Sequence, residues 1–213
     1  MAGKFITIEG GEGAGKSTQA QLLGERLRAK GHKVLLTREP GGSDRAEKIR
    51  DFLLSGSAKG YGAAGEAVLF ASARDDHLEK TIRPALEKGE WVVCDRFMDS
   101  TRAYQGAAGG ARTQLLAALE RLVVGPDRPD LTLVLDRPAD AGLKRARARK
   151  TEGADEAPDR FEAMDEGFHD MLRRGFLDIA RSEPERCVII DAGQNPASVA
   201  EDVWEAVMQR LEP

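Results

Sequence analysis

The stretch Gly10-Gly11-Glu12-Gly13-Ala14-Gly15-Lys16-Ser17 follows the pattern G-x-x-x-x-G-K-S, a phosphate-binding P-loop. Four glycines in six positions let the backbone turn tightly, so that successive N–H groups can point at an anion. Lys16 supplies a mobile positive charge for terminal phosphates, and the Ser17 hydroxyl is an oxygen ligand suited to Mg²⁺. We therefore predict a nucleoside triphosphate site formed by Gly10, Gly11, Glu12, Gly13, Ala14, Gly15, Lys16, Ser17 and Thr18.

Five short and nearly continuous apolar runs predict strands that are buried on both faces, as in a parallel sheet. Helical segments separate these runs, and such alternation indicates right-handed βαβ units. We therefore expect an α/β fold of the three-layer P-loop type, with a five-stranded parallel sheet, helices on both faces and a small lid. The predicted strands are Lys4–Glu9, Lys33–Arg38, Trp91–Asp95, Leu131–Asp136 and Arg186–Asp191. The predicted helices are Lys16–Lys30, Arg45–Leu54, Glu66–Lys88, Thr113–Val124, Ala139–Arg149, Arg160–Arg181 and Pro196–Leu211.

The length of the chain fits one domain, which we expect to span residues 1–213. The glycine-rich stretches 56–65 and 106–110 are interpreted as loops. Residues 151–159 are rich in Glu, Gly, Ala, Asp and Pro, and they separate two helices rather than two domains. We expect a lid segment at 150–159.

Charge and composition exclude several classes of protein. The formal net charge of −4 argues against a general nucleic-acid-binding protein, whose footprint is basic. Cys94 and Cys187 lie in apolar, strand-like runs, and we interpret them as reduced core residues. The N-terminus carries no charged-then-apolar leader, and no apolar run approaches about eighteen residues, so we expect a cytoplasmic protein that does not enter a membrane.

Asp95-Arg96 ends the third predicted strand, at the edge of the sheet where ligands bind in folds of this type. An aspartate there can hold Mg²⁺ or orient Lys16, and an arginine offers a planar fork for phosphate. A salt-bridged strand end is the simpler alternative, which the neighbouring P-loop disfavours. Arg38 closes the second predicted strand and Arg50 lies on the next helix, where each can bind a second anionic ligand or face solvent.

The run Lys144–Lys150 is densely basic, and Arg145 and Arg149 share one face of the predicted helix because they are four residues apart. Such a helix end can place an arginine at a transferring phosphoryl group, in the manner of an arginine finger. A solvated helix and a nucleic-acid patch are the alternatives, and the overall acidity disfavours the second.

Six motifs follow one another along nearly the whole chain, and the most selective is C-D-R-F-M-D-S-T-R-A-Y-Q-G at Cys94–Gly106. The remaining motifs are I-E-G-G-E-G-A-G-K-S-T at Ile8–Thr18, T-R-E-P-G-G at Thr37–Gly42, L-F-x-x-x-R-x-x-H at Leu69–His77, I-R-P-A-L at Ile82–Leu86 and D-R-F-E at Asp159–Glu162. In these motifs and their order the chain resembles the bacterial thymidylate kinases, P-loop nucleoside monophosphate kinases that phosphorylate dTMP with ATP.

The resemblance implies a binding site for the thymidine part of the acceptor. Phe70 would stack on the thymine ring, and Arg74 would hydrogen-bond the edge of the base. Ser100 and Gln105 would face the base or its surroundings. Tyr104 would pack against the deoxyribose, in the space that a ribose 2′-hydroxyl would need. Each role suits its residue, since a flat apolar ring stacks well on a base.

The resemblance also implies the groups that surround the phosphates. Glu12 would accept a hydrogen bond from the 3′-hydroxyl, while Arg38, Arg50 and Arg96 would surround the 5′-phosphate of dTMP and the transferring group. Lys16 and Arg96 would be catalytic. Mg²⁺, bound with the ATP donor, would be held by Ser17 and Asp95.

A further implication concerns the lid. Some thymidylate kinases carry an arginine in the P-loop one place after the acid, where this chain has Gly13. Members with glycine at that place use lid arginines instead. The resemblance therefore implies Arg149, followed by Arg147, as the catalytic lid residue, with Arg145 contributing to ATP binding.

The resemblance implies a homodimer that acts on ATP and dTMP and binds neither nucleic acid nor a membrane. One alternative is a kinase for another nucleoside monophosphate, such as dUMP, UMP or CMP, and Phe70, Arg74, Tyr104 and Gln105 together favour dTMP over these. A second alternative, from another class, is a P-loop GTPase switch module. The sequence Asp191-Ala192-Gly193-Gln194 is faintly similar to a switch element, but the chain has no N-K-x-D guanine-reading motif.

Overall fold

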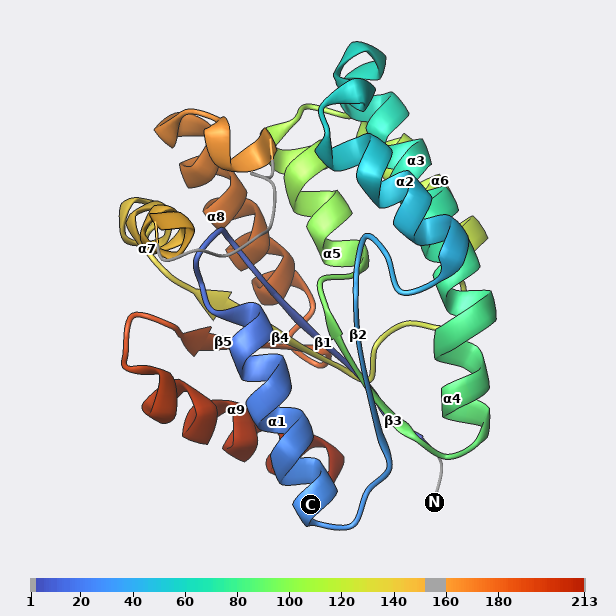
Figure 1. The fold of residues 1–213 in the computed structure, drawn as a ribbon, viewed down its shortest axis with the longest axis vertical. Coiled ribbons are helices and arrows are strands. Elements are labelled where there is room, and N and C mark those ends of the chain that lie inside the picture. Colours follow the sequence, from blue (N-terminus) through green and yellow to red (C-terminus); the bar gives the residue numbers. More distant parts are fainter. Residues whose placement is uncertain (1–2, 152–159, 213) are drawn as a thin grey trace.

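The computed structural model describes residues 3–151 and 160–212. In these residues five parallel strands form one sheet in the order β2-β3-β1-β4-β5, and helices cover both of its faces (Figure 1). The chain enters at the central strand, β1, and later strands are added on either side. The expected three-layer α/β fold is confirmed. The strands are β1 Phe5–Gly10, β2 Val34–Arg38, β3 Trp91–Asp95, β4 Leu131–Asp136 and β5 Cys187–Asp191.

The predicted strand ends differ from the observed ends by no more than one residue. All six residues of β1 are buried, in agreement with a strand covered on both faces. Arg186, predicted as the first residue of the last strand, lies just before β5, and its Nη1 donates to Asp99 Oδ2 at 2.7 Å. Cys94 and Cys187 are buried free thiols, as the sequence indicates, and burial raises the pKa of each.

Helices α1 (Lys16–Ala29) and α9 (Pro196–Leu211) cover one face of the sheet. Ile6 of β1 packs there with Leu23 of α1 and Val203 of α9. Burying side chains of this size stabilises the fold by roughly 1.5–3 kcal/mol each. This layer fixes α1, whose first two residues, Lys16 and Ser17, end the P-loop.

The opposite face is covered by a second set of helices, of which α3 and α5 line the pocket described below. Phe5 and Val92 pack against the segment after β3 and against the helices that precede β3, while Phe176 and Leu172 pack beside Tyr104. Helix α2 (Asp44–Leu54) lies outside, against α3. The helices of this face are α3 Gly62–His77, α4 Arg83–Glu87, α5 Met98–Thr101, α6 Thr113–Val123 and α8 Glu166–Ser182.

The expected loops at 56–65 and 106–110 are largely helical. Ser57–Tyr61 is a 3-10 helix and α3 starts at Gly62, four residues before the predicted start. The segment after β3 continues from α5 into a π-helix, η3 (Arg102–Ala108). A second π-helix, η2 (Leu78–Ile82), joins α3 to α4, so the predicted helix 66–88 changes its winding. These differences arise because tertiary packing overrides the local preference of glycine.

Helices α8 and α9 begin at side-chain caps. Asp165 accepts a hydrogen bond from the Phe168 N–H at 2.8 Å, and Asn195 accepts from the Ser198 N–H at 3.0 Å. Pro196 occupies the first turn of α9, where its missing N–H costs nothing. The predicted start of α9 is confirmed, whereas the predicted helix 160–181 divides into the 3-10 helix η4 (Arg160–Ala163) and α8.

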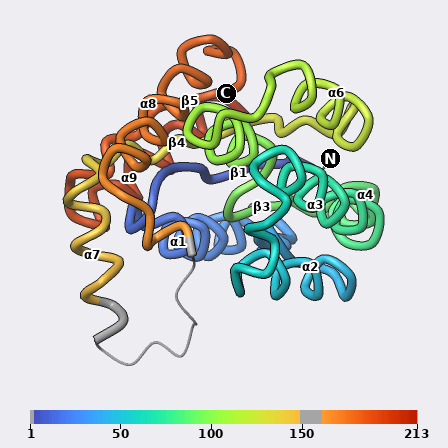
Figure 2. Tube along the Cα trace, turned by 90° about the horizontal axis from the view of Figure 1, so that it is seen from above, coloured from blue at the N-terminus to red at the C-terminus, as the bar shows by residue number. Residues whose placement is uncertain are grey.

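Helix α7 (Ala139–Thr151) follows β4 at the carboxyl end of the sheet. Figure 2 shows it at one edge of the molecule, with its C-terminal half extending away from the other helices. Its first turn touches the P-loop, as described below.

Candidate active site

The P-loop joins β1 to α1 at the carboxyl edge of the sheet. Gly10, Gly13 and Gly15 have φ values of 140°, 66° and 97°, which other residues rarely adopt. Glycine is therefore needed at these three positions because the loop backbone is in a conformation that a side chain would disfavour. Lys16 is buried, and its Nζ donates to the Gly11 carbonyl oxygen at 2.8 Å, which holds the amine over the loop.

Burial lowers the pKa of Lys16 to about 8, and the positive charge of Arg96 acts in the same direction. Glu12, Asp95 and Glu9 oppose this shift. The amine therefore remains mainly protonated at neutral pH, and an added anion would stabilise its charged form. A phosphate at the loop would supply that anion.

Glu12 connects the P-loop to its neighbours. Its Oε1 accepts from Arg96 Nη2 at 2.8 Å and from the Tyr104 hydroxyl. Burial opposes ionisation of this carboxyl, but the charges of Arg96 and Lys16 and the Tyr104 hydrogen bond outweigh burial and lower its pKa to about 2. Glu12 is therefore a carboxylate at any physiological pH.

Arg96 directs its guanidinium back over the P-loop. Its backbone has φ 69°, a left-handed conformation that costs a non-glycine residue about 1–2 kcal/mol. Nη1 donates to the Gly10 carbonyl oxygen at 3.2 Å, and the guanidinium carbon lies 4.9 Å from the centre of the Tyr104 ring. The strained backbone turn places a permanent positive charge where the loop meets the pocket.

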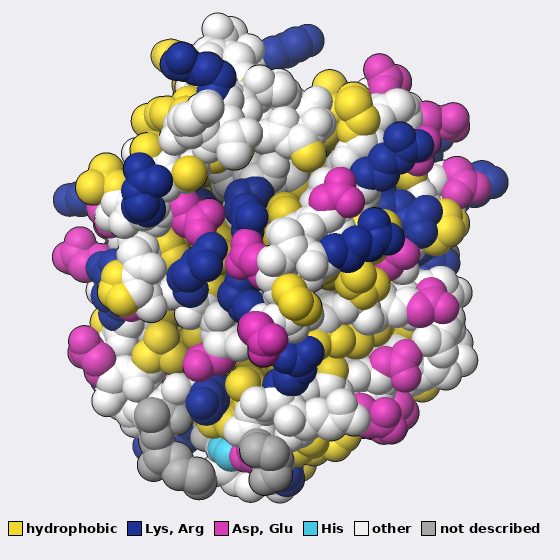
Figure 3. Space-filling model, turned by 180° about the vertical axis from the view of Figure 1, so that it is seen from behind, with side chains coloured by type: hydrophobic (Ala, Val, Ile, Leu, Met, Phe, Trp, Pro, Cys, Tyr) yellow, Lys and Arg dark blue, Asp and Glu magenta, His cyan; other side chains and the backbone are white. Residues whose placement is uncertain are grey.

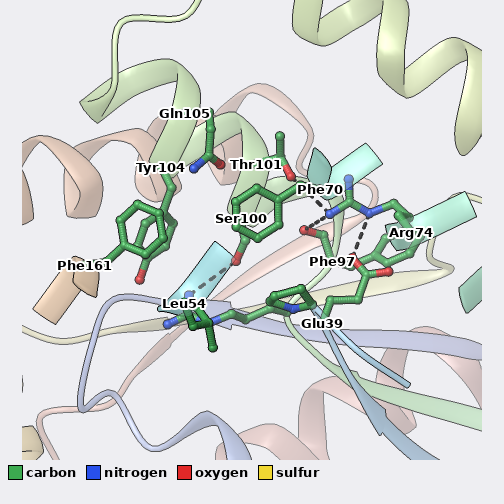
Figure 4. Close-up of a pocket in the computed structure, with 12 residues that line it drawn as sticks. Glu39, Leu54, Phe70, Arg74, Phe97, Ser100, Thr101, Tyr104, Gln105 and Phe161 are labelled. Atoms are coloured by element: carbon green, nitrogen blue, oxygen red, sulfur yellow. Dashed lines mark hydrogen bonds and ion pairs between the residues drawn. The ribbon is translucent and has the colours of Figure 1, made fainter. Parts of the chain in front are cut away.

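A pocket opens beside these residues (Figure 4). The rings of Tyr104 and Phe161 lie together on one side, Arg74 and Glu39 lie on the other, and Phe70 stands between them. This mixture of rings with a few polar groups suits a small aromatic ligand. The lining residues are Glu39, Pro40, Leu54, Phe70, Arg74, Arg96, Phe97, Ser100, Thr101, Tyr104, Gln105 and Phe161.

Arg74 is held from behind by buried partners. Its Nε donates to Glu39 Oε2 at 2.8 Å, and its Nη2 donates to the Thr101 hydroxyl and the Phe97 carbonyl oxygen, both at 3.1 Å. The other oxygen of Glu39 lies 3.1 Å from His77 Nδ1. Glu39, Phe97 and Thr101 thus fix one guanidinium at the pocket wall, and His77 in turn holds Glu39.

Glu9, the last but one residue of β1, organises the segment after β3. Its Oε1 accepts from the Phe97 N–H at 2.8 Å and the Ser100 N–H at 3.2 Å, and its Oε2 accepts from the Ser100 hydroxyl at 2.6 Å. Burial and the nearby Asp99 charge raise the pKa of Glu9 to about 7, against the hydrogen bonds and Arg96. This contact explains why α5 starts so soon after β3.

Ser17 and Asp95 meet as predicted. The Ser17 hydroxyl donates to Asp95 Oδ2 at 2.5 Å. Oδ1 of Asp95 is buried and has no hydrogen-bond partner within residues 3–151 and 160–212. Hard oxygen donors with a spare carboxylate oxygen fit a divalent cation. Across the same described residues, no group of three or more His, Cys, Asp or Glu side chains could hold a metal without other ligands.

Four other predicted residues differ in their relation to the pocket. Arg38 is exposed and pairs with Glu47 Oε2 at 3.2 Å, and Arg50 Nη1 donates to the Pro40 carbonyl oxygen at 2.8 Å. Neither residue lines the pocket. Gln105 does line it, and its Nε2 lies 3.3 Å from Glu66 Oε2. Thr18 is exposed in the first turn of α1.

The basic run lies on α7. Arg145 is half-buried and Arg147 is exposed, while the side chain of Arg149 lies outside the described part of the structure. Of the expected lid segment 150–159, residues 152–159 also lie outside it. The structure therefore describes the base of the predicted lid.

Several residues of the site have no individual sequence signal. Glu9 and Glu39 act as anchors at strand ends, and although they lie within the motifs Ile8–Thr18 and Thr37–Gly42, these motifs do not by themselves assign them a role. His169 of α8 lies beside the P-loop with Arg137, and the Nε2 of the first and the Nε of the second are buried without a partner in the described residues. Glu9, Glu39, His169 and Arg137 were not predicted as site residues, whereas Phe161 lies within the D-R-F-E motif.

A P-loop whose acidic residue contacts Arg96 and Tyr104 at the wall of a ring-lined pocket defines a P-loop kinase for a small aromatic acceptor that carries negative charge. Comparison with known proteins then narrows the class. The family model described as thymidylate kinase matches residues 8–203, and the chain belongs to this family.

Relatives agree over almost the whole length. The chain is 55% identical to thymidylate kinase from Bradyrhizobium sp. strain BTAi1 over 209 residues, which cover 98% of this chain and 91% of that protein. It is 54% identical to thymidylate kinase from Nitrobacter hamburgensis, with 99% and 90% covered. The crystal structure of thymidylate kinase from Ehrlichia chaffeensis superimposes with a TM-score of 0.76 at 33% identity, covering 97% of this chain and 99% of that one.

Proposed function

We propose that this member of the thymidylate kinase family transfers the γ-phosphoryl group of ATP to dTMP, giving dTDP and ADP, with ATP at the P-loop and dTMP in the adjacent pocket. The observation that carries the proposal is the position of Glu12. It belongs to the P-loop, and it also contacts Arg96 and Tyr104 at the wall of the pocket. The two ligand sites therefore share a wall, as direct transfer between two bound nucleotides requires.

The acceptor would be recognised by the ring-lined pocket. Phe70 stacks on thymine, Arg74 bonds the edge of the base, and Ser100 and Gln105 border it. Tyr104 packs against the deoxyribose. Its hydroxyl is hydrogen-bonded to Glu12, so the ring is held in place and leaves no room for a ribose 2′-hydroxyl. The fixed position of Arg74 supports this assignment, since a pre-ordered donor loses little entropy on binding.

The phosphates would be bound at the meeting point of loop and pocket. Glu12 accepts from the 3′-hydroxyl of dTMP, and Arg96 binds the 5′-phosphate and the transferring group. Arg38 and Arg50 stand further out on the same side and complete the anionic acceptor site. The 5′-phosphate oxygen is already an anion, so the transfer needs charge neutralisation and alignment rather than a strong general base.

The donor would be held by the backbone N–H groups of Gly10–Gly15 and by Lys16, with Ser17, Thr18 and Arg145 completing the ATP site. Arg149, followed by Arg147, would stabilise the charge that spreads over the transferring group. Spacing supports Arg149, which lies one turn beyond Arg145 on the same face of α7.

We propose Mg²⁺ as the divalent ion, held by Ser17 and Asp95. Asp95 Oδ1, which has no hydrogen-bond partner in the part of the chain that the structure describes, and the adjacent Ser17 hydroxyl support this assignment. When bound, the ion neutralises phosphate charge. Ser17 and Asp95 would fix the position of the ion, because Asp95 is itself fixed at the end of β3.

We also propose a cytoplasmic homodimer without nucleic-acid or membrane partners. In the described residues no helix is both long and apolar enough to cross a bilayer. Acidic and basic side chains are interspersed over the face seen in Figure 3. Val68 of α3 is exposed, which supports this helix as part of the dimer contact. Light scattering of the purified chain tests the dimer.

A coupled ADP-release assay across dTMP, dUMP, UMP, CMP and AMP tests the activity. We expect dTMP to give the highest kcat/KM, and a preference for a ribonucleotide would contradict the proposal. Tyr104→Phe provides a matched variant that keeps the ring and removes the hydroxyl held on Glu12. We expect this variant to lose discrimination between dTMP and ribonucleotides while keeping its thymine preference.

A further inference from the structure

Two glycines meet where α7 leaves the sheet. Gly13 lies in the P-loop with φ 66°, and Gly142 lies in the first turn of α7, where its N–H donates to the Pro138 carbonyl oxygen at 3.0 Å. A Cβ atom on Gly13 would stand 2.0 Å from the Gly142 carbonyl oxygen. A Cβ atom on Gly142 would stand 2.3 Å from the Glu12 carbonyl oxygen. Backbone therefore touches backbone, and each glycine makes room for the other.

Neither partner can yield. The atoms that a new Cβ would meet belong to main chain, which cannot turn aside as a side chain can. One turn beyond Gly142, Arg145 Nη1 lies 3.6 Å from the position of a Cβ atom on Gly15. Helix α7 thus lies along the P-loop from Gly142 to Arg145, and the glycine contact sets its height above the loop.

We propose that Gly142 is a positioning residue for phosphoryl transfer, because its lack of a side chain seats α7 on the P-loop and brings the arginines of α7 to the phosphates. This inference rests on the proposed function. Gly142 acts through Arg145 and the arginine one turn further along that face, and it touches no substrate. A displacement of about 1 Å in such a group lowers the rate about 10²-fold.

Gly142→Ala tests the inference, with Gly167→Ala as the matched control. Gly167 also lies in the first turn of a helix, α8, but a Cβ there meets only the Asp165 side chain, at 3.2 Å. Alanine is the stronger helix former, so a weaker helix cannot explain a loss of activity. We expect Gly142→Ala to lower kcat 10- to 100-fold with the Kd for dTMP, measured by calorimetry, within twofold of wild type. The control should keep wild-type kcat.

A double-mutant cycle separates positioning from general damage. In an Arg145→Ala background, we expect Gly142→Ala to lower kcat less than threefold further, because the group that it positions is gone. A wild-type kcat for Gly142→Ala, or the same fold-loss in both backgrounds, would overturn the inference. Loss of dTMP binding together with kcat would overturn it as well, since that result marks disruption of the whole site. If the wild-type chain itself fails to phosphorylate dTMP, the proposed function fails instead.

Discussion

The acceptor pocket and helix α7 face each other across the P-loop, and they are built from different kinds of contact. Around the pocket, Arg74 is 5% exposed and Glu39 is also 5% exposed, and their ion pair is surrounded by further hydrogen bonds. On α7, Lys144 and Asp140 approach to 3.9 Å with side chains that are 80% and 65% exposed. The first pair is costly to break, and the second is nearly free.

This difference separates two tasks. The polar groups of the pocket are held in place by the fold before the acceptor binds. Substitutions there should therefore change both the stability of the protein and its affinity for the acceptor. Helix α7 touches the P-loop through Gly142 and packs on α8, and the side chains of Lys144 and Arg147 further along it are exposed. Substitutions further along α7 should change turnover and leave stability and dTMP affinity alone. The predictions below test that division.

Arg96→Ala should have the largest effect, because Arg96 lies where the two regions meet. The substitution removes the positive charge that we propose to bind the transferring phosphoryl group, so kcat should fall roughly 10³–10⁵-fold. It also leaves the buried Glu12 carboxylate without its cation, which should cost about 3–5 kcal/mol of unfolding free energy. A coupled assay and urea unfolding measure the two losses. A variant that keeps its stability would show that Glu12 and Arg96 are not a structural pair.

Arg149→Ala should lower kcat by about 10³-fold without changing stability or the Kd for dTMP. The cause is loss of transition-state charge stabilisation, which a ground-state complex does not use. Arg147→Ala is the matched control on the opposite face of α7 and should lose less. Wild-type turnover in the first variant would reject Arg149 as the lid catalyst, and a larger loss in the second would transfer the role to Arg147.

Glu9 should make stability depend on pH. Its pKa is about 7 in the folded protein against an ordinary 4.5, so the fold favours the protonated form. Unfolding free energy should therefore be highest below about pH 4.5 and fall as pH rises to about 7, by roughly 1.4 kcal/mol for each unit between the two pKa values. Glu9→Gln keeps the shape without the proton, so its stability should vary less in this window.

Glu12 shifts in the opposite direction, and its pKa of about 2 means that its contribution is present above its ordinary pKa of 4.5 and is lost as pH falls through 2. Its titration therefore lies below the window of Glu9. Urea unfolding of wild type and Glu9→Gln between pH 5 and pH 8 compares the two proteins. Parallel curves would show that Glu9 does not titrate in this range.

Asp140→Asn should have the smallest effect. It removes the exposed partner of Lys144, and such pairs contribute at most about 0.5 kcal/mol on a helix. We expect unchanged kcat and a thermal midpoint close to wild type. A loss above 1 kcal/mol would show that α7 depends on its surface charges and not on its contact with the P-loop.

The sequence predicts the fold well because strands buried on both faces are written as continuous apolar runs. It is weaker for α3 and for the segment 98–108. Helix α3 packs against α2 and α6, which lie far from it in the sequence or beyond a loop, and nothing in the local sequence encodes the π-helical winding at Arg102–Ala108. These features depend on tertiary contacts between segments that are distant in the sequence.

For the site, motifs predict which residues gather and do not predict what holds them. Gly10–Ser17 and Cys94–Gly106 are recognisable by spacing, and the structure brings them together. The anchors Glu9 and Glu39 bind groups far along the chain, such as Ser100 and Arg74, so no short pattern contains both partners. The same holds for Gly142, which matters because it has no Cβ atom where α7 touches the P-loop at Glu12.

The shared carboxylate of Glu12 has a thermodynamic consequence. Because one group borders both nucleotide sites, any change that ATP makes in its charge environment alters the free energy of binding dTMP. The same factor must then apply in reverse, since the cycle of four liganded states closes. Calorimetry of dTMP with and without a non-hydrolysable ATP analogue, and of the analogue with and without dTMP, should give a single coupling constant. In Glu12→Gln that constant should move toward one.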